Sequence, residues 1–198
     1  MTRILVIVLM TGGILWSQDF EYVGSQNCKI CHSSSKRGAQ YKVWEESAHA
    51  RAFDTLKGDK AAEIVKEMRL EVVAEKAPEC LVCHTTGFGR GGYEVKDEAF
   101  WNPDPEDRKA RKAARRMAGL QAVGCEACHG PGSEYKSKKT MEAIYGGTVE
   151  AASVGLEIPD EKTCQRCHNE KSPTFKGFKF EEYVKKIIHP DPAELKQD

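Results

Sequence analysis

The sequence has no surplus of basic residues, few aromatic residues and, beyond its first residues, no long apolar run. Lys and Arg together number 30, as do Asp and Glu, so the formal net charge is zero. This balance argues against nucleic acid as the main partner, because binding to phosphates requires a basic surplus. Aromatic residues make up 8% and apolar residues 40% of the chain, which is little for burying a core. We therefore expect a bound group to fill part of the interior.

The first 17 residues are typical of an export signal. Arg3 is the single charge of a short basic region, and residues 4–16 form an apolar run of 13 residues. Such a run is too short to span a membrane and has the length of a signal-peptide core. We predict cleavage near Ser17 and one periplasmic or otherwise exported domain over residues 18–198, with no membrane span. An uncleaved N-terminal anchor is the alternative.

All eight cysteines occur in four Cys-x-x-Cys pairs, and a histidine directly follows each pair. In chain order the motifs are Cys28/Cys31/His32, Cys80/Cys83/His84, Cys125/Cys128/His129 and Cys164/Cys167/His168. Cys-x-x-Cys-His is the attachment sequence of c-type haem, in which two thiols form thioethers and the histidine binds the iron. On a helical turn, residues i, i+3 and i+4 share one face, so all three side chains reach one porphyrin. The sequence therefore predicts four covalently attached haem c groups.

Other uses of paired cysteines fit the pattern less well. A disulfide scaffold suits an exported protein, but it leaves the four histidines unexplained. Zinc ribbons pair Cys-x-x-Cys motifs without needing a trailing histidine. A thioredoxin-like site needs a βαβ unit, which the sequence lacks. Four haems would also supply the apolar core that the side chains do not.

Between the motifs the sequence predicts helices and loops, with almost no strand. Apolar spacing predicts helices over residues 39–56 and 59–68 and a final helix over residues 180–188. A further helix is expected over residues 105–118, with Asp104 as its N-cap. The predicted fold class is mainly α: a multihaem cytochrome c with short helices and long loops wrapped around four covalent haems.

The expected helix over residues 105–118 carries a dense group of cations. Its six basic residues lie within nine positions: Arg108, Lys109, Arg111, Lys112, Arg115 and Arg116. Such a run commonly forms a solvated helix face. It can also dock an acidic redox partner, or neutralise the propionates of a haem. The sequence leaves these alternatives open.

The order and context of the motifs resemble the tetrahaem cytochrome c-554 family, whose best-known member accepts electrons from hydroxylamine oxidoreductase. The shared stretches are the four motifs, Trp44-x-x-Ser47-Ala48-His49-Ala50, Gly87-Phe88-Gly89 with Gly91-Gly92-Tyr93, and the Gly124 and Gly130-Pro131-Gly132 that flank the third motif. They extend over nearly the whole exported part. The resemblance implies a largely helical fold around stacked haem pairs. It also implies three haems with two histidine ligands and one, at the second motif, with a single histidine.

Two histidines, His49 and His189, lie outside the motifs, and both match positions that supply distal iron ligands in this family. We predict that each binds an iron as a sixth ligand, and the sequence does not show which haem each serves. The third distal histidine implied by the family is missing, because residues 133–145 contain none. Met141 in this segment is the first candidate to replace it, and Lys138 or Lys139 is the second. Core packing is the alternative role of Met141.

These features predict an electron carrier, an exported tetrahaem c-type cytochrome that transfers electrons between redox-partner proteins by haem-to-haem hopping. No catalytic residue is identified, because every cysteine belongs to a haem motif. The alternative is a small enzyme that acts on NO, nitrite or hydroxylamine at an open haem iron, above all at the second motif. A subunit of a larger haem complex is a third alternative. Whether the chain is an enzyme stays open, and so do the identities of the electron donor and acceptor.

Overall fold

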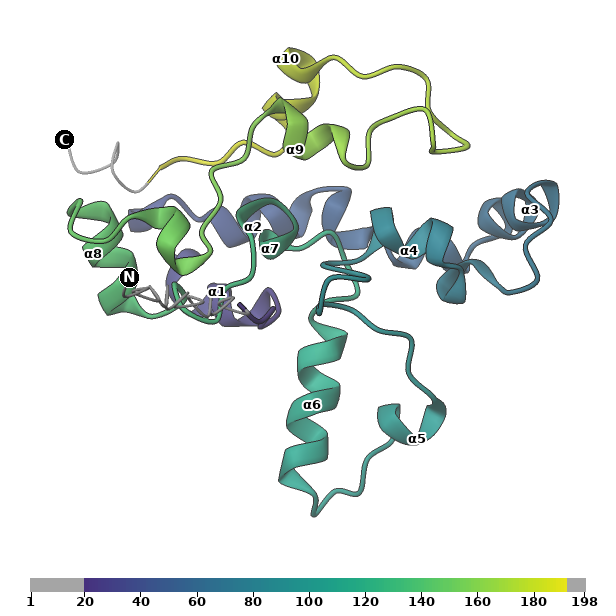
Figure 1. The fold of residues 1–198 in the computed structure, drawn as a ribbon, viewed down its shortest axis with the longest axis horizontal. Coiled ribbons are helices and arrows are strands. Elements are labelled where there is room, and N and C mark those ends of the chain that lie inside the picture. Colours follow the sequence, from purple (N-terminus) through teal and green to yellow (C-terminus); the bar gives the residue numbers. More distant parts are fainter. Residues whose placement is uncertain (1–19, 192–198) are drawn as a thin grey trace, which may run out of the picture.

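The structure, a computed structural model, describes residues 20–191 of the chain. In this part of the chain all regular structure is helical and no strand is present (Figure 1). The mainly α fold class is therefore confirmed. The predicted export signal, residues 1–17, lies outside the described residues. None of the described helices combines the length and the apolar character needed to cross a bilayer.

Short helices and long connections make up the described chain. The α-helices are α1 Gln26–His32, α2 Gln40–Glu46, α3 Asp59–Glu67, α4 Pro78–His84, α5 Glu98–Trp101, α6 Arg108–Ala118, α7 Cys125–His129, α8 Lys138–Tyr145, α9 Glu161–Gln165 and α10 Phe180–Tyr183. Short 3-10 helices lie between them: η1 Ser35–Arg37, η2 His49–Arg51, η3 Asp54–Lys57, η4 Ala74–Lys76, η5 Ala151–Val154 and η6 Val184–Lys186. In Figure 1, α1, α2, α7 and α4 lie along the middle, between α8 and α3 at the two ends. The α9–α10 segment lies on one side and α5 with α6 on the other.

Two predicted helices are interrupted in the structure. The helix expected over residues 39–56 is divided into α2, η2 and η3, because Ser47 adopts an extended conformation with ψ 164°. This break starts a new turn at His49. The final helix expected over residues 180–188 consists of α10 and η6 and stops short of His189. By contrast, α3 covers all but the last residue of the helix predicted over residues 59–68.

The basic helix forms as predicted, but its predicted cap is wrong. Asp107 and not Asp104 is the N-cap of α6, because its carboxylate accepts hydrogen bonds from the backbone N–H groups of Lys109 and Ala110, both at 2.9 Å. Asp104 instead accepts a hydrogen bond from the backbone N–H of Glu106. The Pro105 ring therefore precedes the helix rather than opening it.

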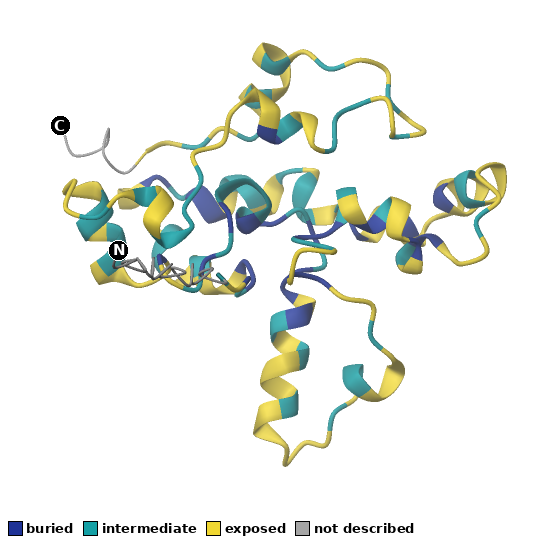
Figure 2. Ribbon diagram, in the orientation of Figure 1, coloured by how far each residue is buried: buried dark blue, intermediate teal, exposed yellow. Residues whose placement is uncertain are grey.

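Buried side chains are few and gather near the middle of the molecule (Figure 2). One cluster joins the second motif to the base of α6; its buried members are Tyr22, Phe53, Leu56, Ala61, Ala74, Leu81, Tyr93, Met117 and Leu120. Leu81, between the two cysteines of the second motif, is completely buried. The second motif is thus held in place partly by the residue between its cysteines.

Hydrogen bonds join the segment after the second motif to the segment before the third. The buried Thr86 hydroxyl donates to the Ala122 carbonyl at 2.6 Å and accepts from the Gly124 N–H at 2.8 Å. The Thr86 N–H also donates to the Leu120 carbonyl at 3.0 Å. Gly124 has no room for a side chain, because a Cβ atom there would lie 2.3 Å from the Ser25 hydroxyl. These contacts hold the end of the second motif close to the start of the third.

A buried carboxylate ties the first motif to the third. Glu126, between the cysteines of the third motif, is 2% exposed. Its oxygens accept hydrogen bonds from the backbone N–H groups of Val23 at 2.8 Å and of Gly24 and Gly132 at 2.7 Å each. Burial raises the pKa of Glu126, and the three N–H donors oppose that shift. The carboxylate therefore satisfies backbone donors from two segments at once.

We expect Glu126→Ala to lower the free energy of unfolding of the haem-containing protein by at least about 3 kcal/mol, because each orphaned buried donor costs about 1–3 kcal/mol. Denaturant unfolding measures this change. The matched control is Gln165→Ala, at the corresponding position of the fourth motif, where the side chain is exposed. Its effect should stay within about 0.5 kcal/mol. Equal losses in both variants would contradict the role of Glu126.

Candidate haem-binding sites

The four motifs form helical turns that bring each pair of thiols and the following imidazole to one side. In the first three motifs, the cysteines and the histidine all lie within α1, α4 and α7. In the fourth, α9 ends at Gln165, and the backbone N–H of His168 donates to the Cys164 carbonyl at 3.0 Å. This bond keeps the helical spacing beyond the end of α9. All eight cysteines are free thiols and half-buried.

Thiol contacts reveal how the motifs lie relative to one another. A hydrogen bond joins the thiols of Cys28 and Cys125, and it raises the pKa of Cys28 and lowers that of Cys125. The first and third motifs are therefore in contact. The third also lies close to the fourth, because burial and then the charge of Cys164 raise the pKa of Cys128 to about 11.

The fourth motif in turn contacts the second. A hydrogen bond between the thiols of Cys83 and Cys167 lowers the pKa of Cys83 to about 7 and raises the pKa of Cys167. Thiol neighbours thus link the first motif to the third, the third to the fourth and the fourth to the second. These links do not follow the order of the motifs in the sequence.

Cys31 differs from its motif partner, because the structure does not bring it into these contacts between motifs. The sequence predicts the same role for both thiols of the first motif, yet only Cys28 meets another motif. Among the residues that the structure describes, no hydrogen bond joins the Cys31 thiol to a cysteine of another motif. Cys31 lies half-buried on α1, one turn and about 4.5 Å further along the helix axis than Cys28. Its role in haem attachment therefore stays a prediction that rests on the motif.

Cys80 is likewise absent from the contacts between motifs. Burial raises the pKa of the Cys80 thiol, and the charges of Glu79 and Cys83, both on the same helix α4, raise it further. Its side chain instead packs against the buried cluster at the base of α6. Haem attachment at Cys80 is thus also a prediction from the motif.

Hydrogen bonds orient three of the four motif histidines. The Nδ1 atom of His84 lies 2.7 Å from the Ala52 carbonyl, and that of His129 lies 3.2 Å from the Glu157 carbonyl. A carbonyl only accepts, so Nδ1 carries the proton and Nε2 keeps its lone pair for a metal. The Nδ1 atom of His32 lies 3.2 Å from the side-chain oxygen of Gln40. His168 is held differently, by stacking of its ring on Phe178 with 5.0 Å between the ring centres.

The side chain of Gln40 forms hydrogen bonds that the sequence did not predict. Its side-chain oxygen accepts from His32, and its amide nitrogen donates to the Pro190 carbonyl at 3.0 Å and to the Arg37 carbonyl. The side chain is buried. It thereby links the first motif to the residue that follows His189. A glutamine in a predicted helix carries no signal for such a role.

The two histidines outside the motifs each face a motif histidine. The ring centres of His49 and His168 are 6.1 Å apart, and those of His129 and His189 are 5.9 Å apart. Two imidazoles bound to opposite sides of one metal ion have ring centres about 6 Å apart, because a metal–nitrogen bond is about 2 Å long. Both distances match this geometry.

The protonation of these rings also suits metal binding. Burial lowers the pKa values of His49, His129 and His168, which favours the neutral form that ligates metals. The Nδ1 atom of His189 is buried and has no hydrogen-bond partner among the described residues. A buried orphaned nitrogen is costly unless a bound group is part of the site. The side chains present therefore fit haem iron at both histidine pairs.

The remaining candidate residues are not brought together in this way. Neither His32 nor His84 belongs to a histidine pair, although all six histidines of the sequence are among the described residues. Met141 lies on α8 and is half-buried. Its ligand role stays a prediction, as do those of His49 and His189.

Comparisons with known proteins find similarity to cytochrome c-554. The family model described as cytochrome c554 and c-prime matches residues 27–103. Cytochrome c-554 of Nitrosomonas europaea is 28% identical over 206 residues, which cover 90% of this chain and 78% of the relative. The structure of reduced cytochrome c554 from the same organism superposes with a TM-score of 0.57 at 28% identity and covers 86% of each chain. The family resemblance is thereby confirmed: the chain is a homologue of cytochrome c-554, and hence a c-type cytochrome that carries electrons with covalently bound haem c.

Proposed function

We propose that this chain is an exported tetrahaem cytochrome that carries electrons between redox-partner proteins by transfer from haem to haem. The observation that carries the proposal is the continuous series of motif contacts: Cys28 with Cys125, Cys128 near Cys164, and Cys167 with Cys83. When bound, haem c supplies a one-electron Fe(III)/Fe(II) couple. A series of adjacent motifs gives four such groups a continuous route from the first motif to the second.

The residues of each motif have separate tasks. The two cysteines hold the cofactor covalently, which prevents its loss outside the cell. The histidine would bind the iron through Nε2, while its Nδ1 hydrogen bond fixes the orientation of the ring. For His84 the partner is the Ala52 carbonyl, and for His129 it is the Glu157 carbonyl. Imidazole rings that are held by these hydrogen bonds would move little when the iron gains or loses an electron.

The histidine pairs support a specific assignment of sixth ligands. We assign His49 to the haem of the fourth motif, opposite His168, and His189 to the haem of the third motif, opposite His129. The first and second motifs then have no second imidazole. This departs from the three bis-histidine haems that the family resemblance implies. Met141 remains the candidate sixth ligand at the first motif, and the second motif keeps an open position.

His49→Ala and His189→Ala should each convert one low-spin haem to high-spin, at the fourth and third motifs respectively, because an imidazole ligand is lost. Low-temperature EPR of the oxidised variants measures the change, and mass spectrometry checks that all four covalent haems remain. The matched control is His84→Ala, which should alter the signal of the second motif alone. A low-spin spectrum that is unchanged in either distal variant would remove that histidine from the ligand set.

The open position at the second motif favours one alternative function, reduction of a small nitrogen oxide at that haem. A carrier should exchange electrons rapidly with a redox protein and react slowly with NO, nitrite or hydroxylamine, because turnover also requires proton delivery and product release. Stopped-flow oxidation of the fully reduced protein separates the two functions. Rapid oxidation through many turnovers by one of these small molecules would overturn the carrier proposal.

A further inference from the structure

We propose that the outward face of α6 docks an acidic redox-partner protein beside the second and third motifs; this inference rests on the proposed carrier function. The face, called the basic face here, consists of Arg108, Lys109, Arg111, Lys112 and Arg115, all of which are exposed. The sixth cation of the helix, Arg116, donates hydrogen bonds to backbone carbonyls at the base of α6 and is not part of this face.

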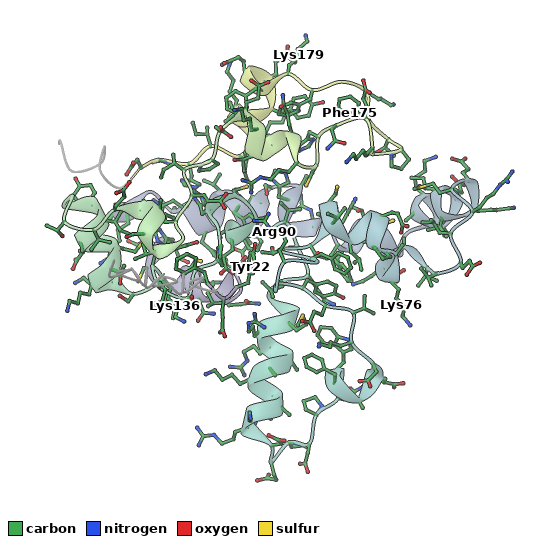
Figure 3. All side chains as sticks on the ribbon, in the orientation of Figure 1. Tyr22, Lys76, Arg90, Lys136, Phe175 and Lys179 are labelled. Atoms are coloured by element: carbon green, nitrogen blue, oxygen red, sulfur yellow. The ribbon has the colours of Figure 1, made fainter. Side chains whose placement is uncertain are left out.

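The basic face is presented to solvent by an arm that projects from the other helices. This α5–α6 arm, residues 98–118, lies apart from the remaining helices in Figure 1. Ala110, Ala114 and Met117 are spaced along one side of α6 and are less exposed than its cations. Figure 3 shows that nitrogen-tipped side chains leave α6 on the side away from α5. The helix thus has one side against the protein and one charged side free for a partner.

The charges of the basic face are not neutralised within the described part of the chain. Elsewhere, lysines such as Lys29, Lys57 and Lys60 form ion pairs with carboxylates. None of the five cations of the basic face forms such a pair among residues 20–191. The chain therefore keeps a cationic surface although its formal net charge is zero.

The carboxylates of the arm itself are largely engaged with the backbone. Asp97 accepts from the Phe100 N–H at 2.9 Å, and Asp107 caps α6. Asp104 accepts from the Glu106 N–H at 2.8 Å. These three acids complete turns at the start of α5 and at the tip of the arm, and no acid of the arm forms an ion pair with the basic face among the described residues.

The base of the arm is anchored beside two motifs. The Arg116 guanidinium donates to the Tyr22 carbonyl at 2.5 Å and to the Gly91 carbonyl at 3.3 Å. The Met117 sulfur accepts from the Glu94 N–H at 3.2 Å. Just beyond the helix, Thr86 binds the segment that leads to the third motif. A partner on the basic face would therefore be held next to the second and third motifs, where electrons can enter or leave.

The side chains of α6 favour a protein rather than a membrane as the partner of the basic face. A helix that lies on a lipid surface inserts large apolar side chains such as Trp, Phe or Leu. The apolar side of α6 offers only alanines and the buried Met117, and it faces the protein. Complementary charge without apolar insertion is typical of electrostatic steering between redox proteins.

The test combines binding and electron transfer with one acidic donor, reduced plant-type ferredoxin. In the arm variant, Arg108, Lys109, Lys112 and Arg115 are all changed to Gln, which preserves helix propensity. The matched control changes Lys36, Lys66, Lys171 and Lys176 to Gln, which removes the same charge from exposed lysines outside α6 that form no ion pair among the described residues. The haem-containing wild type should bind and oxidise ferredoxin at a rate that falls with salt.

We expect the arm variant to lower the second-order rate constant at low salt about tenfold or more, with most of the salt dependence lost. The control should change it less than about threefold. Equal losses in both variants would overturn docking at the basic face, whereas binding without electron transfer would contradict the carrier function alone. Stronger binding of the wild type to vesicles rich in phosphatidylserine, lost in the arm variant, would assign the face to a membrane instead.

Discussion

The fold depends on holding imidazoles from distant parts of the chain at the separation of two ligands on one metal ion. The ring centres of His49 and His168 lie 6.1 Å apart, and those of His129 and His189 lie 5.9 Å apart. Attachment through Cys-x-x-Cys-His is local and imposes nothing on the rest of the chain. The sixth ligands, by contrast, require that separate segments be fixed against one another. In a chain with few apolar side chains, separate segments are joined by hydrogen bonds between the backbone and the side chains of Thr86, Glu126 and Gln40.

The haem motifs were predictable from sequence because their chemistry is encoded in five consecutive residues. The mainly α fold and the family resemblance followed from the same motifs and their context. The pairing of His49 with His168 was not predictable, since it depends on the break at Ser47 and on contacts between distant segments. The role of Glu126 was not predictable either. The three backbone N–H groups that donate to its carboxylate belong to segments on either side of the third motif. The cap of α6 was misplaced because Asp104 and Asp107 both suit an N-cap and local propensity does not choose between them.

The distribution of charge separates two tasks within one small molecule. The interior carries the histidine pairs and the half-buried thiols, where burial keeps imidazoles neutral. The cations of α6 lie on an arm outside this region, yet the base of the arm is bonded to Tyr22 and Gly91, close to the second and third motifs. A surface that attracts a partner can thus be highly charged without placing unpaired charges beside the histidine pairs.

Crystals of the haem-containing protein, measured at the iron absorption edge, test the ligand assignment most directly. Four iron positions are expected, one between His49 and His168 and one between His129 and His189. The other two should lie at His32 and His84, each without a second imidazole. Fewer than four irons, or an iron at His129 or His168 with another residue on its opposite side, would contradict the account.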